Sequence, residues 1–269
     1  MHPRSQASRA VLAAVEPTIS AAGTSATDVA AGLFSVADAL DSHASLRRAL
    51  TDPSRDGAAK KALVADVFTG LDKRSAEVVH TAVATRFSDE RDLADTLESA
   101  GVEAVLIAAE SAKALDTVEQ ELFALQRLLD SERDLRVALD ERSGSSATRV
   151  ELLNTVIGAH VGDHTRVLVQ RLTEAPRSGR LSSAIHGLIT AAASRRDRAV
   201  AHVTAARALT AAQSTRLQKI LTKAYGRDIQ VNVAIEPKVL GGIRVQVGHE
   251  VVDGTVLSRL DEARQKIGG

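Results

Sequence analysis

The feature that most constrains the fold is an internal repeat. When the sequence is compared with itself, residues 33–91 align with residues 122–180 without a gap. The identical pairs are mostly apolar and recur at helical spacing, among them Leu33/Leu122, Phe34/Phe123, Leu40/Leu129, Leu50/Leu139, Leu63/Leu152 and Val78/Val167. Any two Ala- and Leu-rich helical stretches can look alike, but the unbroken register argues against chance similarity. The sequence therefore predicts two copies of one small helical bundle.

Helical periodicity runs from residue 5 to about residue 197. One apolar helix face is formed by Val29, Leu33, Val36 and Leu40. The second copy has a similar face, which is formed by Leu122, Leu125, Leu128 and Leu129. Clusters of Pro, Gly and Ser at residues 52–54, 143–146 and 175–179 indicate connections between helices.

Two local patterns refine this helical region. Ser131 followed by Asp134 predicts a capping box that opens a short helix. Residues 91–114 contain no Pro and only Gly101 as a helix-weakening residue, so we expect one continuous helix that links the two copies.

The periodicity changes at about residue 198. Residues 199–204, 229–235 and 243–247 are predicted to be strands. A capping box at Thr210 and Gln213 opens a helix that runs to Tyr225, with Gly226 as its C-cap. A turn at residues 253–255 leads to a last helix, which completes a βαββα domain.

These patterns predict a mainly α chain with a small α+β C-terminal domain. The expected domains are a first helical bundle (residues 1–100), a second helical bundle (101–197) and a small α/β domain (198–269).

Composition narrows the classes of function. Apolar residues make up 44% of the chain, enough for a core, but aromatic residues make up only 2%. With a formal net charge of zero, the chain lacks the basic excess and the stacking side chains of a nucleic-acid binder. Cysteine is absent, which excludes disulfides and Cys-ligated metal. The first apolar stretch is broken by Glu16 and Pro17, so we expect no secretory signal and a cytoplasmic chain that reaches a membrane only through a partner.

The remaining motifs favour structure over chemistry. Gly241 and Gly242 precede a strand instead of opening a helix, so they do not form a phosphate loop. His160 and His164 could hold zinc if they shared one helical face, but Gly158 and Gly162 predict that the helix ends between them. Residues 195–198 are mainly Arg; they suit a helix C-terminus, and a patch that binds a phosphate or an acidic partner is the alternative. We therefore predict no catalytic, cofactor or metal site.

One resemblance is specific. Residues 237–243, residues 247–248, residues 252–255 and Leu260 together resemble the C-terminal signature of the delta subunit of F-type rotary ATP synthases, whose mitochondrial counterpart is the oligomycin-sensitivity-conferring protein. The resemblance covers about residues 100–267. It implies a helical bundle followed by a small α/β domain, in agreement with the patterns. Residues 1–100 would be an additional bundle, as in some long actinobacterial-type members.

The resemblance implies a non-catalytic peripheral-stalk subunit without a cofactor, located at the cytoplasmic face of the cell membrane. Its partners would be the alpha subunit of the catalytic head and a b-type stalk subunit. By this reading, helical segments of the head bind an apolar groove of the second bundle, with the candidate residues Val102, Val105, Leu106, Val167, Leu168 and Leu172. The C-terminal domain would contact the stalk and carries the signature residues Leu240, Gly241, Gly242, Gly248, Asp253, Gly254, Thr255 and Leu260.

Two alternatives remain open at this level. One is a free-standing helical adaptor protein. The other is a small nucleotide-binding enzyme in residues 198–269, against which the missing phosphate loop counts.

Overall fold

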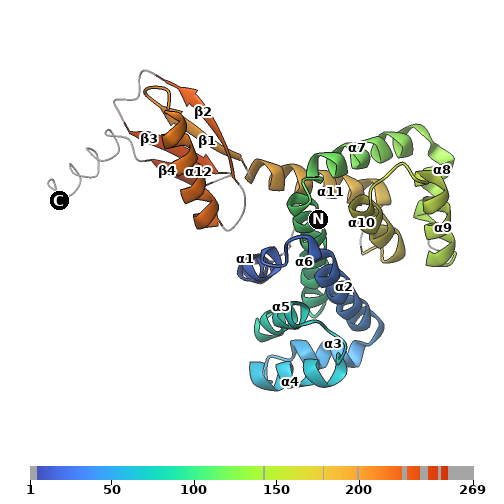
Figure 1. Cartoon of the computed structure of the whole chain (residues 1–269). Helices are drawn as coiled ribbons and strands as arrows, with labels where there is room; N and C mark the ends of the chain where they lie inside the picture. The colour runs from blue at the N-terminus through green and yellow to red at the C-terminus, as the bar shows by residue number, and fades with distance from the viewer. Residues whose placement is uncertain are drawn as a thin grey trace. The chain divides into compact units, whose positions relative to one another are not determined.

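The chain is mainly helical, with a small four-stranded sheet near its C-terminus (Figure 1). The structure is a computed structural model that describes residues 5–141, 143–177, 179–198, 200–225, 229–236, 242–247 and 250–253. It divides into two compact units, Met1–Ala192 and Ala193–Gly269. The predicted fold class is confirmed.

The helical elements follow one another through short connections. They are α1 (Gln6–Ser20), the 3-10 turn η1 (Gly23–Ser25), α2 (Ala26–Ser42), α3 (Ala44–Thr51), α4 (Gly57–Val67), α5 (Lys73–Ala84), α6 (Arg91–Ser111), α7 (Leu115–Ser131), α8 (Arg133–Asp140), α9 (Ser146–Ile157), α10 (Asp163–Glu174) and α11 (Leu181–Arg198).

The repeat is visible in the helix bounds. Helices α7 and α8 begin and end at the residues that the repeat pairs with the ends of α2 and α3. Helices α9 and α10 match α4 and α5 to within one residue at each end. The same alignment matches α1 to the middle of α6, and it matches α6 to α11. Helix α6 is therefore the last helix of one bundle and the first helix of the next, and residue 100 lies inside this shared helix.

A pair of arginines explains one identity of the repeat. The Arg47 guanidinium donates to the carbonyl of Leu40 at 2.8 Å, and Arg136 donates to the carbonyl of Leu129 at 3.0 Å. Each arginine thus satisfies a free carbonyl at the end of α2 or α7. The predicted capping box at Ser131 is wrong, because Ser131 is the last residue of α7 and its hydroxyl donates to the carbonyl of Leu128.

The two copies cap their fifth helix differently. In the first copy Asp72 accepts from the backbone N–H of Arg74 and of Ser75, at 2.9 and 3.2 Å. A Cβ on Gly32 would lie 2.6 Å from the Ser75 hydroxyl, so this position must stay small. In the second copy Glu121 stands where Gly32 does and accepts from the N–H of Gly162 at 3.0 Å. In both copies a carboxylate therefore accepts hydrogen bonds from backbone N–H groups at the start of this helix.

A continuous core of small and aliphatic side chains runs through the helical unit. The predicted faces are buried at Val29, Leu33, Val36 and Leu40 and, in the second copy, at Leu122, Leu125 and Leu129. Leu128 is the exception and is 37% exposed, because it lies about 100° around the helix from Leu129.

The second unit contains β1 (Val200–Ala205), α12 (Ala211–Tyr225), β2 (Gln230–Ile235), β3 (Ile243–Val247) and β4 (Glu250–Asp253). The strand order is β2-β1-β3-β4; β1 and β2 are parallel, and the other pairs are antiparallel. The predicted capping box is confirmed, since the N–H of Thr210 donates to Gln213 and the N–H of Gln213 donates to Thr210. Strand β4 was missed by the sequence prediction. Gly226 and the predicted last helix lie outside the described residues.

Candidate binding surfaces

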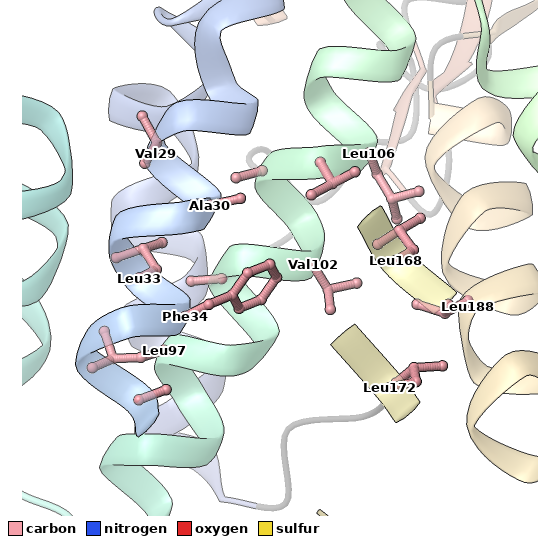
Figure 2. Packing of buried hydrophobic residues seen from close by; sticks show 14 of the residues in the cluster. Val29, Ala30, Leu33, Phe34, Leu97, Val102, Leu106, Leu168, Leu172 and Leu188 are labelled. Atoms are coloured by element: carbon pink, nitrogen blue, oxygen red, sulfur yellow. The ribbon is translucent and has the colours of Figure 1, made fainter. Parts of the chain in front are cut away.

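The two bundles meet along the shared helix. Figure 2 shows Val29, Ala30, Leu33 and Phe34 of α2 beside Leu97 and Val102 of α6, with Leu168 and Leu172 of α10 and Leu188 of α11 on the other side of α6. All of these side chains belong to one cluster of buried residues. The bundles therefore share a core and are not joined by a free linker.

Gly101 allows the closest approach in this core. A Cβ at this position would lie 2.4 Å from Cε1 of Phe34, a distance that real Cβ atoms do not show. Phe34 can therefore rest against the backbone of α6 only because residue 101 has no side chain.

The six candidate groove residues lie in this packed region. Val102, Val105, Leu106, Leu168 and Leu172 are between 0% and 7% exposed, and Val167 is half-buried against the same cluster. In the chain alone they form core contacts and not an open groove.

A buried arginine connects the bundles. Arg171 of α10 donates to both carboxylate oxygens of Asp38 on α2 at 2.8 Å, and to Glu98 on α6 at 2.6–3.1 Å. Its Cζ lies 4.7 Å from the centre of the Phe34 ring. The side chains of Arg171 and Glu98 are 6% and 1% exposed, whereas Asp38 is 50% exposed. The pair with Glu98 is thus the desolvated one.

A second arginine extends this network. Arg177 lies 2.7 Å from Asp41, 3.0 Å from Asp95 and 3.2 Å from Glu98. We call the six residues Asp38, Asp41, Asp95, Glu98, Arg171 and Arg177 the inter-bundle clamp. Its four carboxylates come from α2 and α6, and its arginines come from α10 and the loop that follows α10.

The carboxylates of the clamp stabilise the charge of Arg171. Burial alone would lower the pKa of the Arg171 guanidinium, but its hydrogen bonds to Glu98 and Asp38 outweigh burial and raise the pKa. Arg171 therefore stays protonated at any pH at which the protein folds. Removing one member of a buried pair is strongly destabilising, because it leaves an uncompensated charge.

The sequence prediction missed this clamp. The partners of Arg171 are 73 and 133 residues away, so no local pattern connects them. A signal was present in the repeat, because the positions paired with Asp38, Asp95 and Glu98 are occupied by Arg127, Ala184 and Gly187. Carboxylates that occur in only one of two copies indicate a contact that only one copy makes.

Comparison with known proteins shows which family this chain resembles. Residues 102–267 match the family described as "ATP synthase delta (OSCP) subunit". The "ATP synthase subunit delta" of Beutenbergia cavernae is 46% identical over 258 residues, which are 94% of each chain. The "ATP synthase subunit delta" of Streptomyces coelicolor is 42% identical over 267 residues, 97% of each chain, and that of Kineococcus radiotolerans is 38% identical over 252 residues, 93% of this chain and 91% of the relative.

The chain belongs to the ATP synthase delta (OSCP) subunit family. The family match begins inside α6 and takes in the second bundle and the C-terminal unit. The curated relatives align over nearly the whole chain, so they share the additional first bundle as well. The recognition made from residues 237–260 is confirmed, including its actinobacterial-type length.

The C-terminal signature of this delta-family chain is described only in part. Gly242 has a φ of 84°, a left-handed conformation that favours glycine. Asp253 is the last residue of β4 and stands opposite Arg244 of β3. Leu240, Gly241, Gly248, Gly254, Thr255 and Leu260 lie outside the described residues.

The structure also describes the histidine pair considered for zinc and part of the arginine run at residues 195–198. Helix α9 ends at Ile157, and α10 begins at Asp163, so His160 and His164 do not lie on one helix, as predicted. Within residues 195–198, Arg195 is 1% exposed and is not available to a phosphate or an acidic partner, whereas Arg196 is exposed. In the described part of the chain, no helix is both long and apolar enough to cross a membrane.

Proposed function

We propose that this delta-family chain is the non-catalytic stator subunit of the peripheral stalk of an F-type ATP synthase. It would link the catalytic head to the membrane-anchored stalk, so that proton-driven rotation drives ATP synthesis and does not turn the head. The observation that carries the proposal is the division of a family member into two compact units. In this proposal each unit binds a different partner.

The helical unit suits a part that bears torque. Helix α6 has 21 residues and a length of about 32 Å, and both bundles pack on it. The inter-bundle clamp fixes the bundles to each other through Arg171 and Arg177. Close-packed cores deform little, so a force applied to one bundle is passed to the other.

The partners in this proposal are two. The helical unit would bind the alpha subunit of the head, with the second bundle making the contact and the first acting as a spacer or an added stalk contact. The C-terminal unit would bind a b-type subunit. The chain would lie at the cytoplasmic face of the membrane, held there by these subunits. Val102, Leu106 and Leu168 would support the head-binding surface from within the core.

A truncation tests the division of labour. A chain that ends at residue 197 keeps the helical unit and lacks the sheet. We expect it to bind the purified head as the full chain does, and to lose binding to the b-type subunit. The two affinities are measured separately by biolayer interferometry on immobilised full and truncated chains. Full binding of the b-type subunit by the truncated chain would contradict the assignment.

A further inference from the structure

The repeat identifies a surface of the second bundle that corresponds to the inter-bundle contact. In the first bundle, the contact residues include Phe34 and Asp38 on α2 and Glu98 and Gly101 on α6. The same register gives the matching residues of the second bundle. We call these residues the outer face: Phe123, Arg127 and Asp130 on α7, and Ala184, Gly187, Thr190 and Ala191 on α11.

The two copies differ in how this surface is covered. Phe34 is 8% exposed because it rests on Gly101 and lies under the guanidinium of Arg171. Phe123 occupies the matching position and is 48% exposed. Burying a phenylalanine that is now half in water is favourable by about 1–2 kcal/mol, so the outer face offers binding energy that the first copy has already used.

The charges of the outer face differ from those of the clamp. Asp38 is replaced by Arg127, and Asp95 and Glu98 are replaced by Ala184 and Gly187; only Asp41 has an acidic counterpart, Asp130. A second copy of this chain would bring Arg171 of its own α10 toward Arg127, and the two cations would repel each other. The outer face is therefore not built to receive another second bundle.

Three of the four α11 side chains on this face are small, and the fourth, Thr190, stands where Gly101 stands in the first copy. Ala184, Gly187 and Ala191 recur at intervals of three and four residues and are half-buried. The small side chains at these three positions would let a helix approach α11 closely. A helix laid across them would cover Phe123 and would place one side of its polar edge beside Arg127.

We infer that the outer face binds an amphipathic helix of another subunit, whose apolar side covers Phe123 and which presents a carboxylate to Arg127. This inference rests on the proposed function in one respect, since the helix is taken to come from the same complex. Large aromatic residues and arginine are enriched among interface hot spots, and an amphipathic helix often binds through its apolar side.

Photo-crosslinking tests this contact in the assembled complex. The full chain is produced with p-benzoylphenylalanine in place of Phe123, incorporated into purified ATP synthase and irradiated. The control carries the same group in place of Val67, an apolar residue of the first bundle that is 46% exposed but lies outside the outer face. We expect position 123 to link to one helical segment of another subunit, with an Asp or Glu within one helical turn of the linked residue, and position 67 not to link to that segment.

A charge reversal then identifies the ionic contact. Arg127→Glu should lower the yield of this link about tenfold, the size of one charge-assisted hydrogen bond. Arg133→Glu makes the same charge change at an exposed position of α8 and should leave the yield unchanged. Replacing the partner's carboxylate by Lys in the Arg127→Glu background should restore the yield.

The outcomes separate the two proposals. If the unmodified chain does not co-purify with ATP synthase, the proposed function fails. If it co-purifies but position 123 links to a second copy of the chain, to its own residues 193–269 or to nothing, only the inference about the outer face is wrong. An equal yield from Arg127→Glu and Arg133→Glu would also overturn the inference.

Discussion

Replacing Arg171 by Met should destabilise the helical unit by about 3–5 kcal/mol. Methionine keeps most of the length of the side chain, but it leaves Glu98, which is 1% exposed, without its main partner. Among the described residues, Arg177, with its Nε at 3.2 Å, is the remaining cation beside this buried carboxylate. Asp38 is 50% exposed, so losing its contact contributes at most about 1 kcal/mol.

Urea unfolding of the full chain, followed by circular dichroism at 222 nm, measures this change. For a unit of this size the same loss corresponds to a fall of about 6–20 °C in Tm. Arg127→Met, an exposed arginine of α7, is the matched control and should change stability by less than about 0.5 kcal/mol.

A double variant isolates the reason for the loss. Arg171→Met combined with Glu98→Leu removes both charges, and it should recover most of the stability because no buried carboxylate is left unpaired. An Arg171→Met chain within about 1 kcal/mol of the wild type would refute the reasoning. So would a double variant that is less stable than Arg171→Met alone, because the stability would then not depend on an unpaired Glu98.

Three further predictions concern local geometry. Gly101→Ala should cost about 1–3 kcal/mol, because its Cβ would overlap the Phe34 ring; Gly70→Ala, with open space around it, is the control, and equal thermal shifts would contradict the packing argument. Gly242→Val should lower the Tm of the C-terminal unit, because φ is 84° there; an unchanged Tm with lost b-subunit binding would make this glycine a contact residue. Burial opposes ionisation of Asp72, but hydrogen bonds from Ser75 and Arg74 outweigh it and lower the pKa. The carboxylate thus contributes stability above the unfolded pKa of about 3.9, which is lost as pH falls through the lower folded pKa. Asp72→Asn keeps a capping acceptor but removes the charge, so it should cost about 0.3–1 kcal/mol at pH 7 and less as the pH falls, as urea unfolding at a series of pH values would show.

The helices of this chain could be predicted from sequence because their signals are local. Leu33 and Leu40 recur with the period of a helix, and both are fully buried. The repeat added the second bundle, and even the contact of Arg136 with Leu129 repeats that of Arg47 with Leu40. Strand β4 escaped notice because its sequence, Glu-Val-Val-Asp, does not alternate between apolar and polar residues.

The binding surfaces could not be predicted in the same way. An apolar stripe shows that a face is covered, but it does not show what covers it. Val105 and Leu168 have the pattern of a groove, yet the chain itself fills the space around them. Phe34 and Phe123 are identical in type and register, but Phe34 is buried against Gly101 and Arg171, whereas Phe123 is 48% exposed.

The central claim is that this chain couples the head to the stalk. ATP-driven proton pumping by membrane vesicles tests it most directly, with quenching of a pH-sensitive acridine dye as the readout. Vesicles from cells depleted of this chain should hydrolyse ATP with detached heads but pump no protons. Adding back the full chain together with heads should restore pumping, and the chain ending at residue 197 should not. Undiminished pumping by depleted vesicles would contradict the account.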